Sequence, residues 1–298
     1  MSEPISFERL VAAKKEAPPQ KRLWLSTGTP GIDLAYEIHM PKQPFEDLLV
    51  FYHGGGAHGR AGYDCMARAL SDAAPVAVCL PDVRGHGSSS GPRGHAFPSK
   101  VVWDDVDLMV AGMRRLYPGV RIHLGGHSSG SGMLLNHLTR RQPRETAASL
   151  ILLAPEFGWR AGLYQCDNSF GSFTRVRLWP FLLAACTGGL LGSSLPAVYF
   201  QLPEDAKKFG CLPAYSVGMA NAVTPADPAG QLRQLTLPTH IAVANDDQLI
   251  NANRLAAFIE CNGGNNVHVA RLNDVDHLGV ILDSVPFLSK ALGYPPSH

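Results

Sequence analysis

Residues 120–138 read VRIHLGGHSSGSGMLLNHL, and the predicted fold depends on this stretch. Val120 to Leu124 is typical of a strand, the pentapeptide Gly126 to Gly130 has the form GxSxG, and a helical pattern follows directly. A sharp turn from strand to helix holds the central serine in a strained conformation and projects its oxygen above the sheet. Flanking glycines leave room for the neighbouring backbone. Ser128 is therefore the predicted nucleophile, and the alternative is a plain helix N-cap.

A second GxSxG occurs at Gly87 to Gly91, so the pattern alone decides nothing. This copy lies among glycines and prolines, with no strand before it and no helix after it. Ser89 is therefore interpreted as a loop residue.

Short apolar runs alternate with helical patterns on both sides of the stretch at 120–138. This alternation is typical of an α/β fold with a mostly parallel central sheet flanked by helices. Turn residues at Gly28, Pro30 and Gly31 predict an antiparallel hairpin at one edge of the sheet. The predicted strands are 22–26, 32–39, 47–52, 75–80, 120–124, 149–153, 240–244 and 267–272, and the predicted helices are 59–73, 100–117, 129–141, 251–261 and 278–292.

Residues 157–230 separate two predicted strands by far more than a normal crossover connection, which predicts an inserted cap or lid. The core would then comprise residues 21–156 and 231–298, after a polar leader at 1–20. Residues 178–203 carry no charge, but prolines and glycines interrupt them. An apolar lid is therefore favoured over a membrane span, and contact of this lid with a membrane surface stays open.

Composition excludes several classes of function. The formal charge of +1, with basic residues scattered along 298 residues, offers no field for nucleic acid. The beginning of the chain has no apolar signal region, which predicts a cytoplasmic protein. The cysteines lack the spacing of a zinc site, so no metal is expected and buried thiols are the favoured interpretation. They are Cys65, Cys79, Cys166, Cys186, Cys211 and Cys261.

The loop after the 47–52 strand reads HGGGAH at 53–58. A serine nucleophile needs donors aimed at the developing oxyanion, and these are usually backbone amides. The N–H groups of Gly55 and Ser129 are the predicted oxyanion donors. The same loop also matches GxGxxG, with Asp82 ending the next strand, so a dinucleotide site is a rival hypothesis. That hypothesis leaves the Ser128 turn without a role.

The predicted base is His277, because it follows the last strand and opens the final helix. Other histidines lie in predicted strands or helices, or precede the nucleophile, whereas this fold orders its residues as Ser, acid, His. The acid should follow the 240–244 strand, where Asp246 and Asp247 are both available. A buried carboxylate there would fix the imidazole tautomer. Glu156 is a remote alternative.

With these residues in place, residues 30–293 resemble the monoglyceride lipase and lysophospholipase branch of the α/β-hydrolase superfamily. HGGGAH at 53–58 is similar to the HGxGxH oxyanion loop of that group, and PDVRGHGS at 81–88 with GPRG at 91–94 is similar to its D-x-RGHG-x-S and G-x-RG segment. The GHS at 126–128 agrees too. The group carries G-x-x-D before its acid, which implies Asp247 for that role. Two departures, Ser129 and Ser131, affect the acyl pocket.

The resemblance implies a serine hydrolase that cleaves a carboxylic ester with an acyl chain, such as a monoacylglycerol or a lysophospholipid. The charge-free lid fits such a small-molecule substrate, because apolar walls favour apolar ligands. The catalytic set is then Ser128, Asp247 and His277, with no cofactor required. A thioesterase or acyltransferase with the same three residues is the alternative, and a non-catalytic ligand receptor is the rival from another class.

Overall fold

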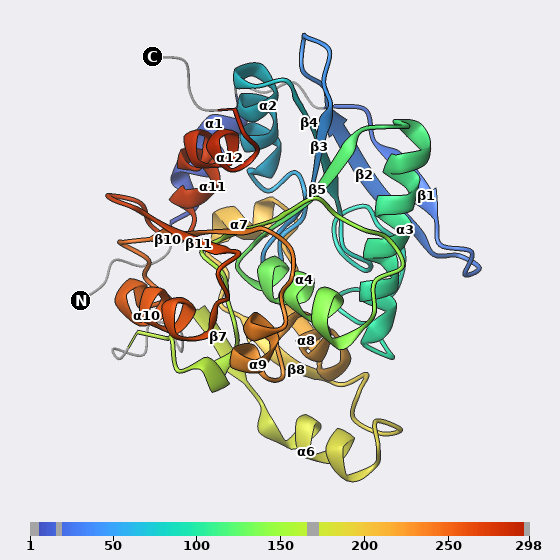
Figure 1. The fold of residues 1–298 in the computed structure, drawn as a ribbon. Helices are drawn as coiled ribbons and strands as arrows, with labels where there is room; N and C mark the ends of the chain where they lie inside the picture. Colours follow the sequence, from blue (N-terminus) through green and yellow to red (C-terminus); the bar gives the residue numbers. More distant parts are fainter. Residues whose placement is uncertain (1–5, 16–19, 166–172, 295–298) are drawn as a thin grey trace.

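The computed structural model describes residues 6–15, 20–165 and 173–294. An eight-stranded sheet forms its centre, with the strand order β1-β2-β4-β3-β5-β6-β10-β11 (Figure 1). The pairs β1–β2 and β2–β4 are antiparallel, and the remaining pairs are parallel. The strands are β1 (Leu23–Ser26), β2 (Asp33–His39), β3 (Asp47–Tyr52), β4 (Val76–Pro81), β5 (Arg121–His127), β6 (Leu150–Leu153), β10 (Thr239–Ala244) and β11 (Val267–Leu272).

Helices cover both faces of this sheet, which confirms the predicted α/β architecture. The side chains of β3 alternate between the two hydrophobic clusters, with Leu48 and Val50 in one and Leu49 and Phe51 in the other. One face carries α1 (Glu8–Lys15), α2 (Tyr63–Ala73), α11 (Gly279–Asp283) and α12 (Val285–Ala291), and the other carries α3 (Lys100–Leu116), α4 (Ser129–Arg140) and α10 (Ala252–Asn262).

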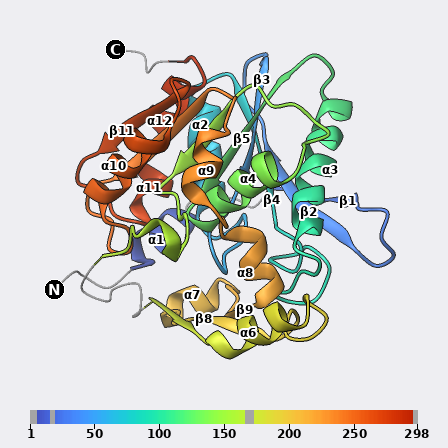
Figure 2. The same cartoon turned by 60° about the horizontal axis from the view of Figure 1, so that its bottom comes forward.

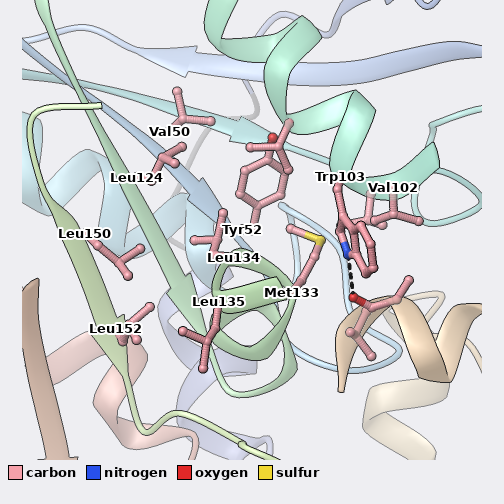
Figure 3. Packing of buried hydrophobic residues seen from close by; sticks show 14 of the residues in the cluster. Val50, Tyr52, Val102, Trp103, Leu124, Met133, Leu134, Leu135, Leu150 and Leu152 are labelled. Atoms are coloured by element: carbon pink, nitrogen blue, oxygen red, sulfur yellow. Dashed lines mark hydrogen bonds between the residues drawn. The ribbon is translucent and has the colours of Figure 1, made fainter. Parts of the chain in front are cut away.

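Helix α4 is anchored by its apolar side against the middle of the sheet (Figure 3). Met133, Leu134 and Leu135 are fully buried among side chains of β3, β5 and β6. Trp103 of α3 adds a hydrogen bond of 2.8 Å from its indole N–H to the carbonyl of Ala222. This packing fixes the start of α4, where the predicted nucleophile lies.

Strand β5 continues to His127, three residues beyond its predicted end. Gly125 and Gly126 favour turns by propensity, but here the packing requires them. A Cβ on Gly125 would lie 2.5 Å from the ring of Phe51, and one on Gly126 would lie 2.8 Å from the backbone of Gly130. The strand therefore reaches Ser128 without an intervening loop.

Two predicted helices differ from the structure by more than one residue at an end or by a break. The helix predicted at 59–73 begins only at Tyr63. The helix predicted at 278–292 is broken at Ser284 into α11 and α12. Pro286 explains the break, because it has no N–H to donate and its ring would clash with a carbonyl one turn earlier.

The described part of the predicted polar leader packs on the core. Phe7 and Leu10 are 7% and 1% exposed and belong to the same hydrophobic cluster as α2 and α11. The thiols also differ from expectation, because Cys186 and Cys261 are exposed whereas Cys79 is buried. Cys166 lies outside the described residues.

The 157–230 segment contains several short elements and a second, three-stranded antiparallel sheet of β7, β8 and β9. The second sheet lies beyond one end of the main sheet (Figure 2). The last helix of the segment crosses residue 230 and packs against α4 and α10. The elements are η1 (Trp159–Ala161), β7 (Thr174–Val176), α6 (Leu178–Cys186), β8 (Pro196–Phe200), α7 (Glu204–Lys208), β9 (Ala214–Ser216), α8 (Val217–Val223) and α9 (Pro228–Arg233).

The charge-free residues 178–203 form α6, a turn region and β8. Large apolar side chains of this stretch are exposed: Leu178, Trp179, Leu182, Leu190 and Leu191. Among the helices of the described chain, none is long and apolar enough to cross a membrane.

Candidate active site

Ser128 lies at the junction of β5 and α4 with a strained backbone, at φ 52° and ψ −120°. Three backbone hydrogen bonds hold this turn: the Ser128 N–H donates to Leu153 O at 3.0 Å, and Ser128 O accepts from the N–H groups of Ser131 at 3.0 Å and Glu156 at 3.1 Å. A Cβ on Gly130 would lie 2.6 Å from the carbonyl oxygen of His53, so only glycine fits there. The sequence-predicted turn is thus present, and the serine side chain is partly exposed.

The three predicted catalytic side chains lie in one hydrogen-bonded row. His277 Nε2 is 3.1 Å from Ser128 Oγ, and His277 Nδ1 is 2.7 Å from Asp247 Oδ2. The other oxygen of Asp247 accepts the N–H groups of Leu249 and Ile250, each at 2.8 Å. These backbone donors fix the carboxylate, which in turn selects the imidazole tautomer with its proton on Nδ1. Nε2 is then free to accept the serine proton.

The structure distinguishes the two aspartates that follow β10. Asp247 is 4% exposed, whereas the side chain of Asp246 points to solvent and only its N–H is bonded, to Val275 O at 3.0 Å. Glu156, the remote alternative, hydrogen-bonds to Tyr164 and to the Gly158 N–H. Of the three carboxylates, only that of Asp247 contacts His277.

Charge around His277 decides its protonation. Burial alone would lower the pKa of His277, but the charge and hydrogen bond of Asp247, aided by Asp276 and Glu156, raise it above the usual 6.5. Burial also raises the pKa of Glu156. The imidazole is therefore a stronger base than a free histidine.

Gly55 and Ser129, the predicted oxyanion donors, lie close together, since a Cβ on Gly55 would be 3.4 Å from Ser129 Oγ. The N–H groups on either side of Gly55 are occupied: Gly54 N–H donates to the Tyr63 hydroxyl at 2.8 Å and Gly56 N–H to the Tyr215 hydroxyl at 2.7 Å. Within the described residues, no acceptor is bonded to the N–H of Gly55 or of Ser129. Both remain available to a ligand oxygen.

Tyr63 and His127 connect the loop at 53–58 to the base, and sequence reasoning missed them. His127 Nε2–H donates to the carbonyl of His277 at 2.9 Å, so Nδ1 accepts from the Tyr63 hydroxyl at 2.8 Å. Burial lowers the pKa of His127 well below its ordinary value, which keeps it neutral. In the sequence, the position of His127 in the GHS triplet was the only signal of this role, and no signal pointed to Tyr63.

The structure argues against a dinucleotide site at the GxGxxG loop. Asp82, the candidate ribose ligand, is 1% exposed, and its carboxylate already accepts from Gly59 N–H, Ser88 N–H and Arg22 at 2.7–2.8 Å. Ser89 of the second GxSxG is buried in a loop, and its hydroxyl donates to Asp82 O at 2.6 Å. In the described part of the chain, no cluster of three metal-ligating side chains occurs.

Comparison with known proteins agrees with this geometry. The model of the family described as serine aminopeptidase, S33 (Hydrolase_4) matches residues 43–279. The chain belongs to this hydrolase family.

Individual proteins of similar sequence or structure give the wider relationship. Human monoglyceride lipase is 32% identical over 135 residues, which span 45% of this chain and only 38% of the human protein. A soluble variant of monoglyceride lipase from Saccharomyces cerevisiae aligns with a TM-score of 0.69 at 14% identity, over 93% of this chain and 97% of that chain. An alpha/beta hydrolase from Penicillium sp. sh18 aligns with a TM-score of 0.66 at 16% identity, over 93% and 98%. These structures confirm the α/β-hydrolase fold.

Substituting the acid tests its assignment against the adjacent aspartate. We expect Asp247→Asn to lower kcat by about 10⁴-fold, because the amide no longer enforces the reactive imidazole tautomer. Asp246→Asn is the matched control and should stay within about threefold of wild type, because its side chain is exposed. Steady-state hydrolysis of p-nitrophenyl butyrate measures both. The opposite ranking of the two variants would refute the assignment.

The raised pKa of His277 predicts the acid limb of the pH profile. Only the neutral imidazole accepts the serine proton, so kcat/KM should fall through a midpoint above pH 6.5 as pH decreases. Glu156→Gln should move this midpoint to lower pH, because it removes a negative charge that favours the imidazolium. Rates measured from pH 5 to 9 would reveal the shift, and an acid limb that is flat to pH 5 would exclude His277 as the base.

Proposed function

We propose that this protein is a serine carboxylic ester hydrolase acting on a small substrate with an acyl chain, such as a monoacylglycerol or a lysophospholipid. The observation that carries the proposal is the row of contacts from Ser128 Oγ through His277 to Asp247, at 3.1 and 2.7 Å, on a strained strand-to-helix turn. Such a turn costs stability, and a nucleophilic role accounts for it.

In the proposed mechanism, Ser128 Oγ attacks the ester carbonyl carbon while His277 Nε2 takes the hydroxyl proton. The N–H groups of Gly55 and Ser129 stabilise the oxyanion. The ester C–O bond then breaks, and His277 returns the proton to the leaving alcohol. Water, deprotonated by His277, attacks the acyl-enzyme, which releases the carboxylic acid and restores Ser128.

Aromatic side chains from the 157–230 segment support a substrate with an acyl chain. The Phe200 ring lies 3.3 Å from the position that a Cβ on Gly55 would occupy. The ring of Phe173 packs against the ring of Phe200, with the two centroids 5.9 Å apart. An apolar wall beside the oxyanion donors suits an acyl chain better than a charged ligand. We propose that the 157–230 segment is the cap that selects the substrate, and the likeness to the two monoglyceride lipases supports a lipid ester.

Turnover of p-nitrophenyl esters from acetate to palmitate tests the proposed reaction. We expect activity that rises beyond acetate, because a longer chain buries more apolar surface, and we expect Ser128→Ala to lower kcat by at least about 10⁴-fold. A fluorophosphonate probe should label Ser128 in the wild type only. Acyl thioesters and aminoacyl p-nitroanilides serve as competing substrates. Turnover of these but not of esters would assign a thioesterase or an aminopeptidase, and no labelling would favour a receptor.

We further propose that the exposed apolar surface of α6 and the following turn contacts a lipid surface. Leu178, Leu182 and Leu190 are 70%, 65% and 87% exposed, and residues 178–203 carry no charge that would oppose insertion. This element projects from the rest of the molecule (Figure 1), so its side chains can reach a membrane without moving the main sheet.

Vesicle binding tests this contact. The double variant Leu182→Ser with Leu190→Ser should bind phosphatidylcholine vesicles at least about tenfold more weakly than wild type, because it removes two apolar side chains from the contact. Leu116→Ser, at a similarly exposed leucine on α3, is the matched control and should bind like wild type. Co-sedimentation gives the bound fraction. Equal binding by all three proteins would refute the contact.

A further inference from the structure

Residues of the 157–230 segment form hydrogen bonds with the loop at 53–58. The Leu212 N–H donates to Gly56 O at 2.7 Å, and His58 Nε2–H donates to Phe209 O at 2.6 Å. The Gly56 N–H donates to the Tyr215 hydroxyl at 2.7 Å. Three hydrogen bonds therefore join residues 209–215 to the loop that carries Gly55.

The Tyr215 hydroxyl cannot rotate freely, because both of its hydrogen-bonding roles are assigned. His86 Nδ1 can only donate to the Arg84 carbonyl, at 3.0 Å, so Nε2 is an acceptor and receives the Tyr215 proton at 2.8 Å. A lone pair of the hydroxyl then faces the Gly56 N–H. Burial lowers the pKa of His86 well below its ordinary value, so the imidazole stays neutral and the arrangement persists.

Two tyrosine–histidine pairs thus flank Gly55. In the main core, the Tyr63 hydroxyl accepts from the Gly54 N–H and donates to His127. On the other side, the Tyr215 hydroxyl accepts from the Gly56 N–H and donates to His86. The first pair is 2% and 1% exposed, and the second is 4% and 0% exposed. Because leaving a buried donor without an acceptor is costly, both N–H groups beside Gly55 are held firmly.

The Tyr215 ring also has a fixed position, because it packs edge-on against Phe200 with centroids 4.9 Å apart. Phe200 in turn lies against Gly55. The second sheet therefore touches the loop both through the Tyr215 hydroxyl and through an aromatic ring. Displacement of β9 away from the loop would lengthen the bond from the Gly56 N–H to the Tyr215 hydroxyl and leave the Gly55 amide less firmly held.

We propose that Tyr215 is a positioning residue that completes the oxyanion hole from the 157–230 segment, so that this segment contributes to the chemical step as well as to substrate selection. This inference rests on the proposed esterase function. Its consequence is that oxyanion stabilisation depends on β9 being docked, because the Gly56 peptide has no other described partner for its N–H.

Tyr215→Phe tests the role of the hydroxyl while it keeps the ring that packs on Phe200. We expect kcat to fall about 10- to 100-fold, below the loss for a missing oxyanion donor, with KM within about threefold. An alkylboronic acid provides the second readout, because addition of Ser128 makes boron tetrahedral and places an oxygen in the oxyanion hole. The inhibition constant of the boronic acid should rise by the same factor by which kcat/KM falls.

Tyr199→Phe is the matched control, because Tyr199 is also a cap tyrosine but its hydroxyl meets only Pro196 O, at 3.4 Å. It should leave kcat and boronate affinity unchanged. Rates are normalised to active sites titrated with the fluorophosphonate, which separates loss of folded protein from slower chemistry. An unchanged kcat in Tyr215→Phe, or a rise in KM alone, would overturn the inference while the esterase function stands. Wild type that neither hydrolyses esters nor binds the boronate would overturn both.

Discussion

The structure depends on a close crossing of backbones at the turn that carries Ser128. A Cβ on Gly126 would meet the backbone of Gly130 and Ser131 at 2.8–2.9 Å, so β5 and the start of α4 are in close backbone contact. A Cβ on Gly130 would meet the carbonyl oxygens of Tyr52 and His53 at 2.6–2.7 Å, so α4 is equally close to the end of β3. This crossing holds Ser128 in a strained backbone conformation with a positive φ of 52°. Burial of Met133, Leu134 and Leu135 against the sheet fixes α4 and so offsets the strain at Ser128. The direction of the serine oxygen is therefore set by packing of the whole core.

Much of this arrangement could be predicted from the sequence, because local patterns determine it. Buried strands read as apolar runs, and the GxSxG turn requires glycine at fixed spacing, so both are visible without a structure. His277 could be found because the fold fixes the order of the catalytic residues. From the sequence, only a family resemblance favoured Asp247 over Asp246. The two residues differ in burial, which is a property of the folded chain and cannot be read from adjacent identical residues.

Other features could not be predicted because they join distant segments through residue types that carry no pattern. Tyr63 meets His127 across 64 positions and Tyr215 meets His86 across 129. The extension of β5 through Gly125 could not be predicted either, because glycine has a low strand propensity and only the packing against neighbouring side chains explains its presence in the strand. By contrast, Pro286 did signal the break in the last helix, and Phe7 and Leu10 did have helical spacing. Both features could therefore have been predicted from the sequence.

The hydrogen bonds between residues 209–215 and the loop at 53–58 limit how this protein can be re-engineered. Under the proposed role of the 157–230 segment in substrate selection, exchanging it for that of a relative would change substrate preference. Such a chimera would lose the bonds to Gly56 and His58 unless the donor segment carries a hydroxyl and backbone groups at the same places. A successful graft therefore has to preserve the β9 strand and replace only the part from α6 to the start of β8.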